Sequence, residues 1–155
     1  MFYLWLKLIH IVSSTLLFGT GLGSAFYMFM ANLKRDNLIH LQRTTRNVVI
    51  ADFLFTTPAV IIQPLTGLVM VYFAGFSLTS FWILASLLLY VLVGLCWIPV
   101  VFIQMKLEKL ITWAIVNQQE LPANYYRLYR TWFILGWPAF IGVLIIFYLM
   151  VIKIV

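Results

Sequence analysis

Charged side chains are scarce in this chain: Asp, Glu, Lys and Arg make up only 9% of its 155 residues, whereas 65% of the residues are hydrophobic. The mean hydropathy is +1.06, far above the range of soluble globular domains, so a water-soluble fold is excluded. The length allows a single transmembrane domain over residues 1–155. Because Asp52 and Glu108 are expected at different depths, no carboxylate pair is available and hydrolytic chemistry is not expected.

Cysteine is also nearly absent, and the single Cys96 excludes both an intramolecular disulfide and a cysteine-based metal site. The net charge is +6, but the chain lacks a run of interleaved basic and aromatic residues that would grip a phosphate backbone. A nucleic-acid partner is therefore not expected. In a chain this apolar, Lys and Arg act as topology signals beside anionic lipid, and the lipid bilayer is the predicted partner.

Four apolar stretches are each long enough to cross a bilayer, which takes about 20 residues. They cover residues 4–31, 48–75, 81–105 and 132–155. The sequence thus predicts an all-α protein, an integral membrane antiparallel four-helix bundle. Residues 106–118 keep the helical pattern of the third stretch, and we expect them to extend that helix into the membrane interface until Pro122 ends it.

The basic residues predict how the helices are oriented. Eight of the ten Lys and Arg fall between the first and second stretches or between the third and fourth. They are Lys34, Arg35, Arg43, Arg46, Lys106, Lys109, Arg127 and Arg130. By the positive-inside rule these connections face the cytoplasm, so both termini face the periplasm and the protein is a multi-pass protein of the bacterial inner membrane.

The second stretch carries polar residues at helical spacing, which predicts one stripe facing the bundle interior. The stripe consists of Asp52, Thr56, Gln63, Thr66, Gly67 and Met70. Pro58 and Pro64 release the carbonyls of Leu54 and Val60, and nearby Thr and Gln side chains are expected to compensate. The stripe either supplies hydrogen bonds to the backbone groups at these two kinks or lines a cavity. Asp52 is expected in the first turns of its helix, near Arg46. On the first stretch, Gly19 and Gly23 predict close approach of a neighbouring helix.

His10 lies one turn inside the first apolar stretch, where an ionisable side chain is costly and suggests a function. A structural, hydrogen-bonded histidine and a metal ligand both remain open. Zinc is not expected, because neither cysteine, histidine nor glutamate shares its depth. Haem b needs only one protein ligand and gains most of its binding from apolar contacts. The face of the third stretch that carries Trp97 suits the wall of such a pocket.

The opening motif YLWLKLIHI, residues 3–11, resembles the first helix of HemJ-type protoporphyrinogen oxidases and is similar to the wider CopD-like group. The resemblance implies that His10 is the axial metal ligand of haem b. On the haem-b hypothesis, the candidate sixth ligands at the outer face are Met70, Met150 and Lys153. Where that family carries arginine and then histidine, this chain has Tyr27 and Asn32. The resemblance therefore does not imply that this chain oxidises protoporphyrinogen.

Four segments resemble the recurring blocks of a bacterial family of predicted integral membrane proteins, domain of unknown function 2269. They are residues 5–10, 55–67 (FTTPAVIIQPLTG), 97–104 (WIPVVFIQ) and 136–153. This resemblance spans nearly the full length, and it implies a fold and a location.

The sequence leaves three functions open, and it leaves open whether the protein is an enzyme. The first is a haem-b protein with a redox or electron-transfer role, exchanging electrons with quinone or another membrane protein. The second is a non-enzymatic membrane subunit or scaffold. The third is a transporter along the polar stripe, which requires a homo-oligomer because four helices rarely enclose a path.

Overall fold

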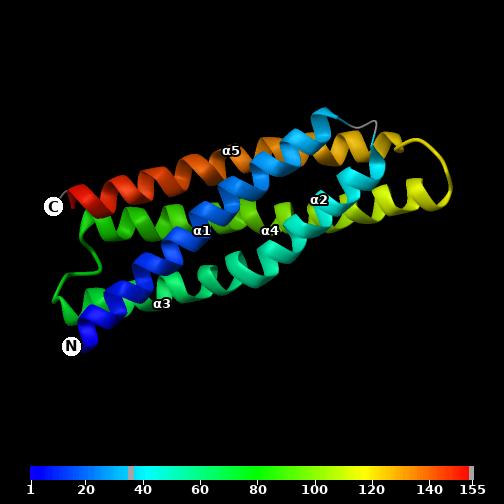
Figure 1. The fold of residues 1–155 in the computed structure, drawn as a ribbon. Coiled ribbons are helices and arrows are strands. Elements are labelled where there is room, and N and C mark those ends of the chain that lie inside the picture. The colour runs from blue at the N-terminus through cyan, green and yellow to red at the C-terminus, as the bar shows by residue number, and fades with distance from the viewer. Residues whose placement is uncertain (35–36, 154–155) are drawn as a thin grey trace.

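A computed structural model describes residues 1–34 and 37–153, and these residues form only helices joined by short connections. Arg35 and the last two residues of the predicted span 132–155 lie outside them. The helices are α1 (Phe2–Leu33), α2 (Leu38–Ala51), the π-helical turn η1 (Asp52–Thr56), α3 (Thr57–Phe73), α4 (Phe81–Val116) and α5 (Ala123–Ile152), as Figure 1 shows. Within the described chain, four helices are long and apolar enough to cross a membrane, with α2, η1 and α3 forming one of them.

The second membrane helix begins at Leu38, well before the apolar stretch that starts at Val48. Its first turns are held by Asn37, whose side chain accepts a 2.9 Å hydrogen bond from the His40 backbone N–H. Leu41 and Thr45 then face inward at a helical step and are fully buried. Helix formation here therefore depends on an amphipathic face, and hydropathy does not detect it.

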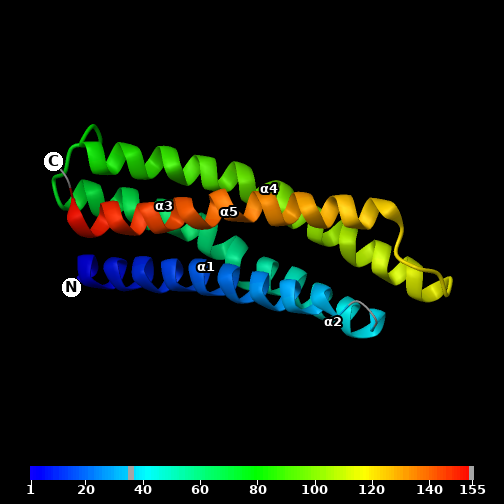
Figure 2. The ribbon, with the colours of Figure 1, turned by 90° about the horizontal axis from the view of Figure 1, so that it is seen from above.

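The helices pack as two pairs at the end of the molecule that carries both termini. There α1 packs on α3 and α4 packs on α5, whereas α1 and α5 meet through aromatic side chains, with Phe18 against Phe140 and Phe29 against Phe133. At the opposite end α2 packs against α1 and α4, and the buried core lies there around Met28, Leu107 and Tyr125. The Tyr125 hydroxyl donates a 2.6 Å hydrogen bond to Asn32 Oδ1 and so connects α5 to α1. Figure 1 shows the two pairs diverging toward the termini, and Figure 2 shows α1 set apart from α4.

A glycine of α5 lies at a close contact between two helices, whereas the glycines of α1 do not. A Cβ added at Gly142 would lie 2.6 Å from Val93 Cγ2, so α4 and α5 approach closely at this position. By contrast, a Cβ at Gly19 or Gly23 would meet no described atom within 4 Å. The prediction that these two glycines bring a neighbouring helix of the same chain close to α1 is therefore wrong. In the described part of the chain the space beside these two glycines is open, although Phe18, next to Gly19, stacks on Phe140 of α5.

Candidate functional site

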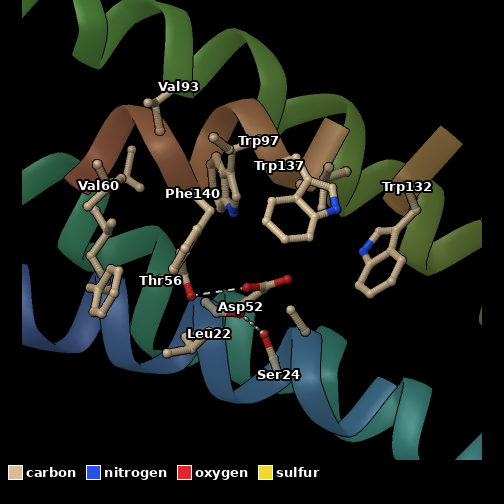
Figure 3. A pocket seen from close by; sticks show the side chains of 18 of the residues that line it. Leu22, Ser24, Asp52, Thr56, Val60, Val93, Trp97, Trp132, Trp137 and Phe140 are labelled. Atoms are coloured by element: carbon tan, nitrogen blue, oxygen red, sulfur yellow. Dashed lines mark hydrogen bonds between the residues drawn. The ribbon is translucent and has the colours of Figure 1, made fainter. Parts of the chain in front are cut away.

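A cleft of about 310 Å³ lies between the two helix pairs and is lined by α1, η1, α3, α4 and α5. Its walls are apolar and rich in aromatic rings, and Figure 3 shows Trp97, Trp132 and Trp137 around its centre. Trp132 is buried, whereas Trp137 and Phe133 are 54% and 40% exposed. The cleft therefore has buried rings such as Trp132 in its interior and exposed rings such as Trp137 at its edge.

Three glycines keep this cleft open. Gly21 of α1, Gly94 of α4 and Gly136 of α5 all line it, and a Cβ built on each would meet nothing within 4 Å in the described structure. Glycine destabilises a helix interior by roughly 0.5–1 kcal/mol relative to alanine. The open space therefore depends on side chains that three separate helices leave out.

The polar floor of the cleft is formed by Asp52. The residue is only 3% exposed, and its Oδ1 accepts a 3.0 Å hydrogen bond from Thr56 Oγ1. Asp52 Oδ2 is buried, and the described residues offer it no hydrogen-bond partner. The Gln104 amide of α4 interacts with the same carboxyl group, and its own Oε1 is buried without a hydrogen-bond partner among the described residues. Figure 3 shows the Asp52 carboxyl group directed into the cleft beside the indole rings. Two hydrogen-bond acceptors thus lie unpaired in an apolar setting.

The helix has a π turn where Asp52 and Thr56 line the cleft, and Val60 continues the cleft lining beyond this turn. Pro58 lacks a backbone N–H, and the turn before it widens, so that the Thr57 N–H donates to the Asp52 carbonyl five residues earlier. Thr57 Oγ1 donates to the same carbonyl at 2.9 Å. Because a π turn holds more residues than an α turn, it rotates the residues before it relative to those after it. Asp52 and Thr56 line the cleft, whereas Gln63 faces α1. The single stripe predicted from the sequence is therefore two separate sites.

Two further expectations about this helix are wrong. Asp52 does not lie in the first turns of its helix, because the helix begins at Leu38. The carbonyl released by Pro64 is that of Val60, and it is Tyr90 of α4, rather than a nearby Thr or Gln, that donates a 2.6 Å hydrogen bond to it. This bond fixes α3 to α4 at the edge of the cleft. The sequence shows only that Tyr90 shares a helix face with Trp97.

His10 belongs to a separate polar network between α1 and α3. Its Nδ1 lies 2.8 Å from Thr66 Oγ1, and its Nε2 lies 3.1 Å from Gln63 Nε2. The Thr66 hydroxyl donates to the Ile62 carbonyl at 2.8 Å, so Nδ1–H must be the donor to Thr66 and Nε2 must accept from Gln63. Ser13 Oγ donates to Gln63 Oε1 and completes the network.

These contacts do not fit an axial haem ligand. Both ring nitrogens of His10 are engaged, and Gly67 packs so closely that a Cβ there would lie 3.2 Å from His10 Cε1. Iron would need one of the two nitrogens to lose its partner. Haem b at His10 stays a prediction of the resemblance only. The described residues also contain no group of three His, Cys, Asp or Glu that would hold a metal ion.

The other predicted cofactor residues are dispersed. Trp97 lines the cleft, and among the described residues that line it there is no His10, Met70, Met150 or Lys153. Lys153 Nζ lies 5.4 Å from the ring centroid of Phe76 and 5.9 Å from that of Trp82, at the end of the molecule that carries the termini. The structure therefore brings Trp97 together with Asp52, and not with His10.

Helices of this length and hydropathy define a multi-pass integral membrane protein. The family model described as predicted integral membrane protein (DUF2269) matches residues 4–154, and the chain belongs to this family. No curated protein and no solved structure matches the chain. The likeness of residues 3–11 to HemJ-type enzymes has no further support from these comparisons.

Proposed function

We propose that this protein binds a lipid-soluble molecule in the cleft between the α1–α3 and α4–α5 pairs. The observation that carries the proposal is the pair of unpaired acceptors, Asp52 Oδ2 and Gln104 Oε1, at the floor of an aromatic cleft. A volume of about 310 Å³ falls at the small end of the range for small-molecule sites, which runs from about 300 to 1,000 Å³.

The unpaired oxygens define what the occupant must offer. A buried acceptor without a partner costs about 1–3 kcal/mol, so two of them together call for a shared hydrogen, either a proton on Asp52 or a donor on a bound molecule. An oxidised quinone carries only carbonyl acceptors and does not supply one. An alcohol or an amine with an apolar body does, because its donor reaches Asp52 while its body packs against the Trp97 and Trp132 rings.

The geometry of the helix pairs supports entry from the bilayer. Between α1 and α5 the cleft is bordered by aromatic side chains that are exposed: Trp137, and Phe133, whose ring stacks on Phe29 of α1. In a membrane, side chains at such an edge contact acyl chains rather than water. A ligand dissolved in the bilayer therefore reaches Asp52 without crossing an aqueous phase.

The charge distribution supports an orientation for the site. The basic side chains gather at the end of the molecule away from the termini: Lys34 follows α1, Arg43 and Arg46 lie in α2, and Lys106 and Lys109 lie in the C-terminal part of α4. By the positive-inside rule, the helices cross a bacterial inner membrane in alternating directions with both termini on the periplasmic side. No specific contact among the described residues favours the scaffold or the oligomeric transporter over binding in one chain.

Filling the cleft tests the proposal. We expect Gly21→Leu to lower the affinity for the neutral probe 1-pyrenemethanol by about tenfold or more, because the leucine side chain occupies the space that Gly21 leaves. Binding is read as energy transfer from tryptophan to pyrene in phosphatidylcholine nanodiscs. Gly19→Leu is the matched control, since Gly19 lies two residues away, does not line the cleft and also has open space around it. Equal binding by wild type, Gly21→Leu and Gly19→Leu would contradict the proposal.

A further inference from the structure

We infer that the occupant of the cleft carries a positively charged ammonium group, and that this cation exchanges with a proton on Asp52. The inference rests on the proposed function and identifies the chemical class of its ligand. It starts from the two atoms that the fold leaves unpaired, Asp52 Oδ2 and Gln104 Oε1, in side chains that are each only 3% exposed. Both atoms accept hydrogen bonds, so the missing partner is a donor.

The surroundings favour a charged donor over a neutral one. A carboxylate forms its strongest hydrogen bonds with cationic donors such as an ammonium N–H. The faces of tryptophan rings attract cations, and Figure 3 shows Trp97, Trp132 and Trp137 around the Asp52 carboxyl group. Phe18 of α1 and Phe140 of α5, whose ring centroids lie 5.5 Å apart, also line the cleft and suit the apolar body of an amine. One carboxylate beside three indole rings thus forms a site for a lipid-soluble ammonium ion.

The same two oxygens indicate what the site holds when the amine is absent. A bare carboxylate in an apolar cleft is costly, whereas a protonated Asp52 donates its proton to Gln104 Oε1 and pairs both oxygens with one hydrogen. When an ammonium ion enters, that proton leaves to solvent and the ammonium N–H groups take its place. The cleft and its occupant are neutral together in both states, so exchange avoids an uncompensated charge.

Asp52 is the group that titrates in this scheme. The other titratable side chain that lines the cleft is Tyr90 of α4, whose hydroxyl donates to the Val60 carbonyl. The described residues that α1 and α5 place on the cleft carry no ionisable group. Three further charged residues, Arg46 of α2 and Glu108 and Lys109 in the C-terminal part of α4, line a separate pocket. A proton taken up or released in the cleft is therefore assigned to Asp52.

The test compares two probes that differ in charge and share one ring system. We expect 1-pyrenemethylammonium to bind wild type at least about tenfold more tightly than 1-pyrenemethanol, and Asp52→Asn to abolish this preference while it still binds the alcohol. Glu108→Gln is the control for loss of an acidic side chain elsewhere, and it should keep the preference. Equal affinity of wild type for both probes, or a preference that survives in Asp52→Asn, would overturn the inference.

Proton release by the wild-type protein is a separate test, and it does not depend on whether Asp52→Asn folds. Binding of 1-pyrenemethylammonium should release about one proton, measured by calorimetry in buffers of different ionisation enthalpy, and its affinity should rise with pH between about pH 5 and pH 8, where the amine stays charged. Binding without proton release would overturn the exchange. If the alcohol binds in the cleft but the amine binds no better, this inference fails and the proposed function stands; if Gly21→Leu affects neither probe, both fail.

Discussion

His10→Ala is expected to lower the free energy of unfolding by about 2–4 kcal/mol in mild detergent. The imidazole makes two hydrogen bonds from α1 to α3, at 2.8 Å to Thr66 and at 3.1 Å to Gln63. Its removal leaves the Gln63 amide without that partner and opens space beside Gly67. His40→Ala is the control, because His40 is the second histidine, is exposed, and should change stability by less than about 0.5 kcal/mol.

The same variant separates the structural reading of His10 from haem ligation. With both ring nitrogens engaged, we expect wild type and His10→Ala purified from haem-replete cells to have the same absorption near the Soret region. The variant should differ in stability only. A Soret band in wild type that disappears in His10→Ala, but not in His40→Ala, would show that the His10 imidazole binds iron. It would contradict a His10 whose two ring nitrogens are hydrogen-bonded to Thr66 and Gln63.

Gly142→Ala is expected to destabilise the protein by about 1–3 kcal/mol, although alanine is the better helix former. The added Cβ would lie 2.6 Å from Val93 Cγ2, and a branched side chain on a rigid helix has little freedom to move away. α4 and α5 would have to separate at their closest contact. The measurement is the shift in thermal or chemical unfolding relative to wild type.

Gly136→Ala gives the matched comparison on the same helix with the opposite sign. A Cβ there meets nothing within 4 Å in the described structure, so the gain in helix propensity should stabilise the protein by roughly 0.5–1 kcal/mol. The double variant Gly142→Ala with Val93→Ala should recover part of the loss, because the obstructing methyl group is gone. Equal effects of Gly142→Ala and Gly136→Ala would contradict the close contact between α4 and α5.

The four membrane helices were predictable because the transfer of apolar side chains into lipid depends on composition, which hydropathy measures directly. The start of the second membrane helix at Leu38 could not be predicted from hydropathy, because its first turns are polar overall and depend on a narrow apolar face that includes Leu41. Chain segments outside the hydrocarbon core form helices by capping and amphipathicity. Those signals are present in the sequence but are weaker than a long apolar run.

The site was predicted in pieces rather than as a whole. Trp97 was predicted as a cofactor-binding residue, whereas Asp52 was placed only in the polar stripe, together with Gln63, because an ideal α-helix puts them on one face. In the structure Asp52 and Val60 line the cleft while Gln63 contacts His10 of α1, and the π turn at Asp52–Thr56 has only a faint signal in the sequence, the Pro58 that follows it. The bond from Tyr90 to the Val60 carbonyl depends on the tilt between α3 and α4, which side-chain spacing on one helix does not reveal.

Reaction with dicyclohexylcarbodiimide reports whether Asp52 is protonated and accessible from the bilayer. This apolar reagent reacts with protonated carboxyl groups: the O–H adds across a carbon–nitrogen double bond, and the acyl group then moves to nitrogen to give a stable adduct that mass spectrometry locates. We predict modification at Asp52, not at the exposed Glu120, and protection of Asp52 by 1-pyrenemethylammonium but not in Gly21→Leu. An Asp52 that stays unmodified, or is modified equally with and without the amine, would contradict a lipid-accessible site that exchanges a proton for a cation.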